Sequence, residues 1–196
     1  MISARDIRHA LTGAVLLARG ERTGVAYFED TPRDFWRSFW AAAVVAPVWL
    51  LLIAIAGPDT DAGPLRVMLA EVVEYALLWT AFPLVLHEIL SRSGIDEHFC
   101  RYIAVHNWAS VIVAPAMLVA IIIGTAVPLD ILQLLPILVI ISSLVYEWFM
   151  AKVMLEVSGA TAAGIAAMDF FLGHVINLVV EALLAAPTGT DLGLGQ

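Results

Sequence analysis

Residues 40–56 read WAAAVVAPVWLLLIAIA, and they decide the fold because they form the centre of a run from Ser38 to Pro58 without a charged side chain. About 20 residues of helix cross a hydrocarbon core, so this run is long enough to span a bilayer. The whole chain has a matching composition: 61% of its residues are hydrophobic, 14% are charged, and its mean hydropathy is +0.90. These values lie outside the range of soluble globular proteins and predict an integral membrane protein.

Four further stretches have the length of a membrane-spanning helix: residues 67–90, 102–129, 131–151 and 160–185. Backbone polar groups must find their hydrogen bonds within the chain when lipid surrounds them, and only helices do so at these lengths. Glycine, proline, serine and aspartate gather between the stretches and predict short turns. We therefore predict an all-α membrane protein with five transmembrane helices.

Three regions follow from this pattern: residues 1–37 as a cytoplasmic amphipathic segment, 38–186 as the five-helix transmembrane domain, and 187–196 as a flexible external tail. The first region repeats apolar residues at helical spacing, namely Ile7, Leu11, Ala14, Val15 and Ala18. This spacing predicts an amphipathic helix lying on the inner membrane surface. A signal peptide is the alternative interpretation, but no small-x-small cleavage site follows the apolar run. Thr31 and Pro32 predict the start of a second helix, with Thr31 as its N-cap.

The distribution of basic residues predicts the orientation, because lysine and arginine in short loops stay on the cytoplasmic side. Nine of the ten basic residues fall on one side of the predicted bundle: Arg5, Arg8, Arg19, Arg22, Arg33, Arg37, Arg92, Arg101 and Lys152. Only Arg66 falls on the other. We predict a cytoplasmic N-terminus and an external C-terminus. Abundant alanine, valine and arginine beside a single lysine are typical of a GC-rich bacterial source, which favours the bacterial inner membrane.

Acidic and amide side chains within the spans form a predicted polar intramembrane face. Its members are Glu71, Glu74, Glu88, Glu147, Asp169, His174, Asn177 and Glu181. Helical spacing places Glu71 and Glu74 on one face of the second span, and Asp169, Asn177 and Glu181 on one face of the fifth. Antiparallel packing should bring Glu71 and Glu74 to the depth of Glu181. It should also bring Glu88, His106, Asn107 and Glu147 together near the cytoplasmic end.

Three interpretations of this face stay open at the level of sequence. A charge at mid-bilayer costs on the order of 3 kcal/mol, so such residues usually have a partner or a function. They could be protonated and hydrogen-bonded between helices, which would fix the packing of the bundle. They could instead conduct protons or cations through Glu71, Glu74, His174 and Glu181. Carboxylates with His174 could also hold a metal ion, but their spacing matches no known ligand motif, and we predict neither a metal site nor a cofactor.

Motifs of established enzyme chemistry are incomplete, and we predict no catalytic residues and no enzymatic activity. His87 and Glu88 begin an HExxH pattern, but Ser91 stands where the second histidine is required. Phe170 and His174 have the FxxxH spacing of CAAX-protease-like peptidases, without the adjacent glutamate pair. No Gly-rich phosphate loop occurs, and no basic groove predicts nucleic-acid binding. The single cysteine, Cys100, excludes an internal disulfide.

Two stretches carry a resemblance to a known family. Residues 99–110 read FCRYIAVHNWAS at the start of the third predicted span, and Tyr146-Glu-Trp148 is followed through Lys152 to Ser158-Gly159 before the fifth. With the five-span plan, these stretches resemble the Yip1 superfamily of small membrane proteins over residues 35–185. Bacterial Yip1-like chains similarly begin the third span with a basic-aromatic segment and end the fourth at a tryptophan.

The resemblance implies an architecture and a class of function. Eukaryotic members act in vesicle traffic and bind prenylated small GTPases, but their Asp-Leu-Tyr-Gly-Pro signature is missing here. We therefore expect a non-enzymatic scaffold or assembly partner that contacts membrane lipids and a second copy of itself or another membrane protein. Small residues such as Ala41, Gly159 and Ala163 would permit close helix approach. The alternative function is a small transporter or a proton- or cation-conducting subunit that uses the embedded carboxylates.

Overall fold

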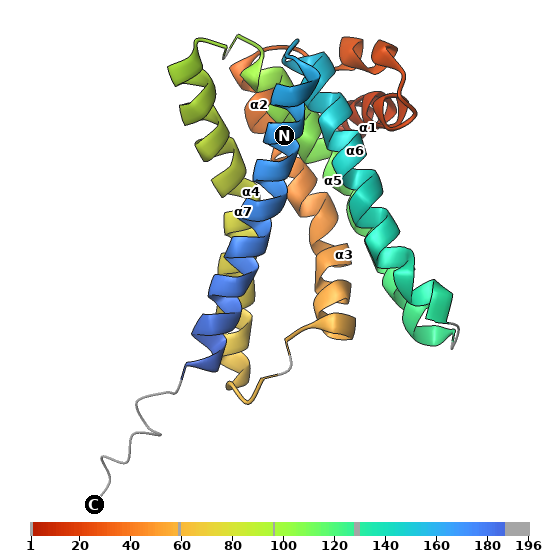
Figure 1. Cartoon of the computed structure of the whole chain (residues 1–196), viewed down its shortest axis with the longest axis vertical. Coiled ribbons are helices and arrows are strands. Elements are labelled where there is room, and N and C mark those ends of the chain that lie inside the picture. The colour runs from red at the N-terminus through yellow and green to blue at the C-terminus, as the bar shows by residue number, and fades with distance from the viewer. Residues whose placement is uncertain (1, 59, 96, 128–129, 187–196) are drawn as a thin grey trace, which may run out of the picture.

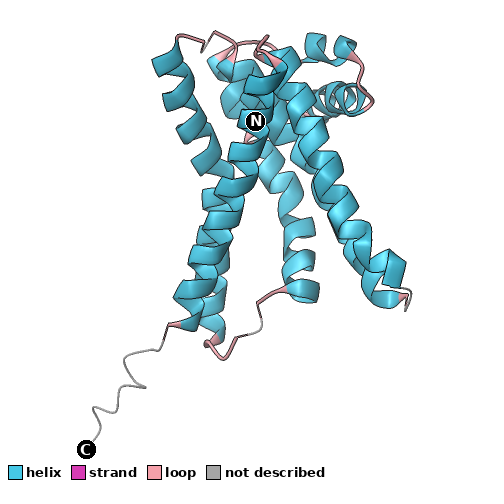
Figure 2. Ribbon diagram, viewed as in Figure 1, coloured by secondary structure: helices cyan, strands magenta, loops and turns pink. Residues whose placement is uncertain are grey.

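The computed structural model of the protein describes residues 2–58, 60–95, 97–127 and 130–186. These ranges form helices joined by short connections, and no strand occurs within them (Figures 1 and 2). The elements are α1 (Ala4–Ala18), η1 (Arg22–Tyr27), α2 (Pro32–Ser38), α3 (Trp40–Ala56), α4 (Pro64–Ser93), α5 (Phe99–Ala126), η2 (Asp130–Leu134), α6 (Leu135–Met154) and α7 (Gly159–Ala185). The all-α prediction is confirmed. The predicted tail, residues 187–196, lies outside the described residues.

Among the described residues, five helical segments are long and apolar enough to cross a membrane, which confirms the predicted number of spans. They are Pro32–Ala56, Pro64–Ser93, Phe99–Ala126, Asp130–Met154 and Gly159–Ala185. The second span is longer than residues 67–90 because α4 begins with Pro64 at its first position and ends before Gly94. Proline is favoured at a helix start, and Gly94 adopts the left-handed conformation that closes a helix, with φ of 65°.

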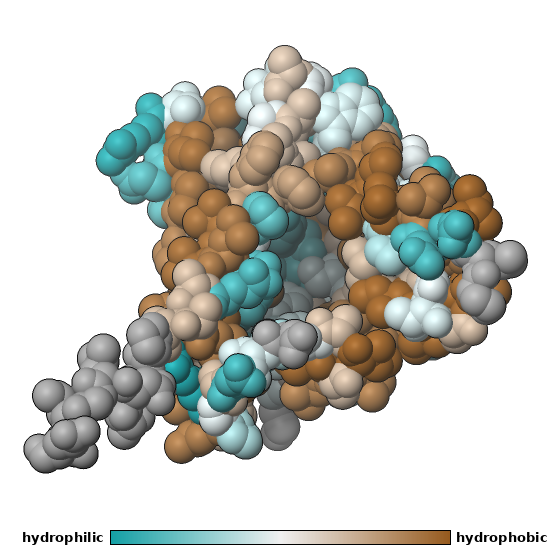
Figure 3. Space-filling view, turned by 60° about the horizontal axis from the view of Figure 1, so that its bottom comes forward, coloured by the Kyte–Doolittle hydropathy of each residue, from teal (hydrophilic) through white to brown (hydrophobic). Residues whose placement is uncertain are grey.

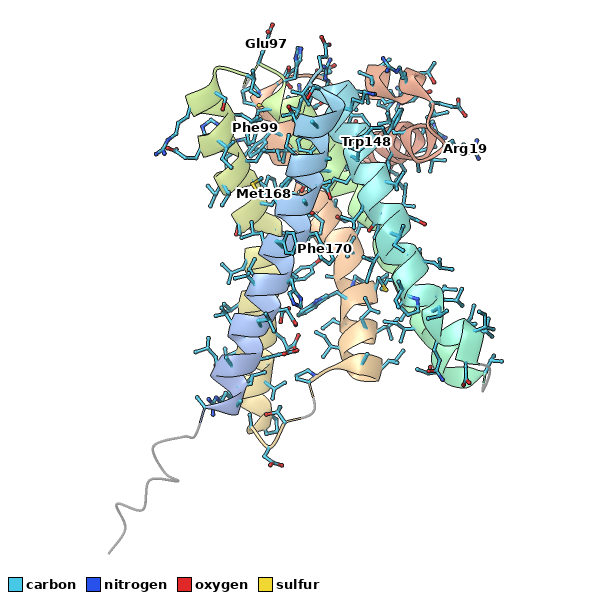
Figure 4. All side chains as sticks on the ribbon, in the orientation of Figure 1. Arg19, Glu97, Phe99, Trp148, Met168 and Phe170 are labelled. Carbon is cyan, nitrogen blue, oxygen red and sulfur yellow. The ribbon has the colours of Figure 1, made fainter. Side chains whose placement is uncertain are left out.

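The spans alternate in direction between two ends of the bundle. We call them the α1 end, which also holds the α4–α5 and α6–α7 connections, and the C-terminal end, which holds the α3–α4 connection and the last turn of α7 (Figure 1). Arg19 and Glu97 lie exposed at the α1 end (Figure 4). The placement of the α1 end in the cytoplasm stays a prediction.

The tightest packing lies at the α1 end. Tyr102, Leu86 and Met150 are buried there with at most 2% of their surface exposed. The short helix α2 begins as the sequence predicts: the Thr31 hydroxyl accepts a hydrogen bond from the Asp34 amide, with Pro32 at the first helical position. Exposed apolar side chains cover the outer surfaces of the spans, as expected of helices that face lipid.

Helix α1 packs against this core. Gly13, Ala14 and Leu17 are buried, and the Tyr146 hydroxyl donates a 2.7 Å hydrogen bond to the Ala14 carbonyl oxygen. At its start, the Ser3 amide and hydroxyl donate to the Asp6 carboxylate. These bonds, led by the Ser3 backbone contact, lower the pKa of Asp6 below its ordinary value, and Arg37 adds an ion pair. The rest of the protein thus covers part of the predicted apolar face of α1. The placement of α1 on a membrane surface stays a prediction.

Candidate functional site

A cavity of about 460 Å³ lies between α3, α4, α5 and α7 in the half of the bundle near the C-terminal end. Three carboxylates and one amide border it, from Glu71, Glu74, Glu181 and Asn177. The other lining residues are Trp49, Leu52, Ile53, Ala56, Gly57, Pro58, Met117, Ile121, Val180 and Leu184. Seen from the C-terminal end, the molecule is hollowed at its centre, with hydrophilic residues around the opening (Figure 3). We call this the acidic cavity.

Helical spacing on two antiparallel helices builds the acidic cavity. Glu71 and Glu74 are three residues apart on α4, and Asn177 and Glu181 are four apart on α7, so each pair shares a face. The Asn177 Nδ2 donates a 3.4 Å hydrogen bond to Oε1 of Glu74 and joins the two faces. The prediction that Glu71 and Glu74 lie at the depth of Glu181 is confirmed by their shared cavity.

No basic side chain among the described lining residues neutralises the carboxylates of the acidic cavity. Glu71 is only 9% exposed, yet no described side chain donates a hydrogen bond or an ion pair to it. No lysine or arginine is among the described residues that border the cavity. Arg66, the basic residue at this end, donates instead to the carbonyl oxygens of Leu183 and Ala186 at the end of α7. Among the described lining residues, the Asn177 amide is the group that donates a hydrogen bond to a carboxylate of the cavity.

A second polar cluster lies nearer the α1 end, where His106 of α5, Glu147 of α6 and Asp169 of α7 converge. One ligating atom from each lies within 4.8 Å of the other two. Nδ1 of His106 is 3.4 Å from Oε1 of Glu147, and both side chains are largely buried. The fully buried Tyr102 donates its hydroxyl to the same Glu147 oxygen at 3.1 Å. We call His106, Glu147 and Asp169 the triad.

The structure separates two members of the predicted polar face from both sites. Glu88 is exposed on α4 and forms a 2.5 Å ion pair with Arg92. His174 is exposed on α7, where it stacks on Phe170 with ring centroids 6.5 Å apart. No described contact joins Glu88 to Glu147. His174 does not border the acidic cavity and does not belong to the triad.

Asn107 forms its hydrogen bond with α2 and is not part of the triad. Its Nδ2 donates a 2.8 Å hydrogen bond to Oγ of Ser38, and both residues are 1% exposed. This bond attaches α2 to α5 within the core. His106, its neighbour in sequence, instead turns toward Glu147 and packs on Phe82 with ring centroids 4.7 Å apart.

Comparison with protein-family models, with curated proteins and with solved structures finds no match. The resemblance to the Yip1 superfamily therefore stays a prediction. The geometry of the chain offers two candidate functional sites, the acidic cavity and the triad.

Proposed function

We propose that this protein moves cations across a membrane and that the acidic cavity is where they enter. One observation carries the proposal: Glu71, Glu74 and Glu181 share a cavity near one end of the bundle, without a basic residue in its described lining. Clefts lined by one sign of charge and walled by apolar groups focus the electric field and concentrate counter-ions. Acidic side chains grouped around a pore are a recurrent basis of cation selectivity in channels.

The energetics of burial support this choice over a purely structural function for these acids. A charged carboxylate within a span costs on the order of 3 kcal/mol, and hydrogen-bonded pairing between helices would offset that cost. Of the three cavity carboxylates, only Glu74 has such a partner among the described residues, in Asn177. Glu71 is 91% buried without one among the described residues. A cation in the cavity would stabilise Glu71 and Glu74 together.

Cation flux into liposomes tests the proposal. Purified protein is reconstituted, and proton and potassium gradients are followed with fluorescent indicators. Glu74→Gln keeps the side-chain shape and the acceptor for Asn177 but removes the charge, so we expect flux to fall at least tenfold. Glu88→Gln is the matched control, because Glu88 lies on the same helix but is exposed and paired with Arg92. Flux no faster than in empty liposomes, or equal in Glu74→Gln and the intact protein, would refute cation transport.

The side of cation entry has its own test, because Glu181 is exposed and borders the cavity. Cys100 is the single cysteine, so Cys100→Ser with Glu181→Cys gives one reactive thiol at the cavity. A membrane-impermeant cationic thiol reagent should modify this thiol from the C-terminal side only and block flux. Modification from the α1 side alone, or modification that leaves flux unchanged, would contradict entry through the acidic cavity.

A scaffold or assembly function is the second candidate, and exposed small residues on α7 favour it. Ala160, Ala163, Gly164 and Ala167 are exposed along the first turns of α7, and a Cβ added at Gly164 meets no atom within 4 Å. Such stripes let a neighbouring membrane helix approach closely. Ala163→Leu should then reduce crosslinking to a second copy or to another membrane protein without changing flux. Unchanged crosslinking would argue against assembly through α7.

A further inference from the structure

The triad joins three helices through polar side chains that are buried or partly buried. His106, Glu147 and Asp169 each come from a different span, and no two of them are closer than 22 residues in sequence. Their ligating atoms nevertheless lie within 4.8 Å of one another. A histidine nitrogen with two carboxylate oxygens is a donor set typical of divalent transition metals, and three protein ligands with one free position are typical of functional zinc sites.

The charge of the triad favours a divalent cation. The triad holds two acids and one imidazole in a region walled by Phe82 and Tyr102. Two carboxylates, a neutral imidazole and a divalent ion sum to zero. Because an uncompensated charge in an apolar environment is costly, a bound divalent ion would let both acids be ionised there without leaving a net charge.

The distances are close to those of a bound ion. Zinc bonds of about 2.0–2.2 Å hold tetrahedral ligand atoms roughly 3.4 Å apart. His106 Nδ1 and Glu147 Oε1 are 3.4 Å apart already. A ligand atom of Asp169 lies within 4.8 Å of both residues' ligand atoms, so the three side chains are near enough to share one ion.

Tyr102 holds Glu147 in place by a hydrogen bond, as neighbouring residues commonly do for metal ligands. Tyr102 is fully buried and lies one helical turn before His106 on α5, and its hydroxyl donates to Glu147. Hydrogen bonds of this kind hold ligating carboxylates in one orientation and raise metal affinity. We propose that His106, Glu147 and Asp169 bind one divalent transition-metal ion, with Zn²⁺ the best match to the donor set. This site does not depend on the proposed cation transport.

Metal titration of the full-length protein tests the proposal. Protein purified in detergent is stripped with a chelator and titrated with Zn²⁺ by calorimetry, and bound metal is counted by elemental analysis. We expect one equivalent per chain. His106→Gln, Glu147→Gln and Asp169→Asn should each weaken binding at least tenfold, whereas Glu88→Gln should bind as the intact protein does.

A second measurement on the intact protein guards against variants that fail to fold. X-ray absorption at the zinc edge should show one imidazole nitrogen with carboxylate oxygens, and Co²⁺ in place of Zn²⁺ should give the visible spectrum of a low-coordinate site. A folded protein that binds no Zn²⁺, binding that is unchanged in all three triad variants, or a spectrum without imidazole would overturn the proposal. The triad would then be an ion pair that shares a proton.

Cation transport through the acidic cavity and metal binding by the triad can be refuted independently of each other. Glu74→Gln should abolish flux and leave zinc stoichiometry and affinity unchanged, because Glu74 is not among the triad. Loss of zinc binding in His106→Gln with flux retained would place the metal in a structural function. Weaker zinc binding in Glu74→Gln would contradict an independent metal site.

Discussion

A single methyl group added at Gly13 should loosen α1 from the segment that follows it. A Cβ at this position would lie 2.5 Å from Cβ of Tyr27 and 2.7 Å from Cε2 of Phe28. Cβ of Tyr27 is fixed to the backbone of η1 and cannot rotate away. The substitution Gly13→Ala therefore forces α1 and η1 apart, although Gly13 lies within a helix where alanine is otherwise preferred.

Two opposing effects set the magnitude. Alanine in a helix interior is more favourable than glycine by about 1 kcal/mol. Overpacking a close contact costs typically 1–3 kcal/mol, and the contact with a backbone-fixed atom places this case in the upper part of that range. The net effect is a loss of about 1–2 kcal/mol, which corresponds to a roughly five- to thirtyfold larger population of the detached α1.

Hydrogen exchange of the α1 amides in detergent micelles measures this population. Gly13→Ala should speed their exchange by that factor without changing α7. Gly164→Ala is the matched control: it also replaces a glycine within a helix, but its Cβ meets no atom within 4 Å. We expect slower or unchanged exchange of α7 in that variant. Exchange of α1 in Gly13→Ala no faster than in the intact protein would refute the packing of α1 against η1.

Three further predictions concern single polar contacts. Asn107→Ala removes the buried bond to Ser38 and should lower stability by about 1–3 kcal/mol; an unchanged thermal midpoint in detergent would count against that bond. Arg66→Gln removes the bonds to the Leu183 and Ala186 carbonyls, so the last turn of α7 should exchange faster while α1 is unaffected. Asp6 should titrate by NMR below 3.8, so its stabilisation of α1 is complete above that pH and is lost as the pH falls through the lowered pKa. Ser3→Ala removes the hydroxyl bond but keeps the amide bond, so it should return the pKa only part of the way toward 3.8.

The spans were predictable because lipid imposes one strong rule on sequence. Hydrophobic length alone found all five helices, and residues 40–56 coincide with α3. The boundaries of α4 were less predictable because they depend on local backbone chemistry. Pro64 extends the helix at its start and Gly94 ends it, whereas hydropathy places the boundaries where the apolar residues begin and end.

The acidic cavity was partly predictable. Periodicity shows which residues share one face of a helix, but it does not show which residues of the other helices that face contacts. His174 and Glu181 are seven residues apart and lie within about 20° of one another around α7. Glu181 nevertheless borders the cavity and His174 does not. The cavity includes α7 only from Asn177 onward, and that limit depends on where α3, α4 and α5 separate.

The triad was the least predictable feature because it joins residues from three spans. The sequence placed His106 and Glu147 near one end but assigned Asp169 to the ladder with Asn177 and Glu181. Asp169 does share α7 with them, yet its carboxylate meets His106 and Glu147. Helix rotation and depth both decide this meeting, and neither can be obtained from a single sequence.

The acidic cavity and the triad lie in succession along α7. Asp169 and Asn177 are eight residues apart, about 12 Å of helix. Gly173 lies between them, with its added Cβ 3.7 Å from Cδ2 of Leu78 on α4. We expect a cation that moved along α7 from the acidic cavity to the triad to pass this contact. Gly173→Leu would fill it, whereas Gly164→Leu on the same helix adds bulk in open space.

Zinc loading rates of the two variants therefore test whether the sites communicate. If ions reach the triad through the acidic cavity, Gly173→Leu should slow loading of reconstituted protein from the C-terminal side at least tenfold. The final stoichiometry should stay the same, because no ligand is altered, and Gly164→Leu should load at the normal rate. Equal rates in both variants would mean that the triad takes up metal by another path, since the Gly173–Leu78 contact would not lie on the route.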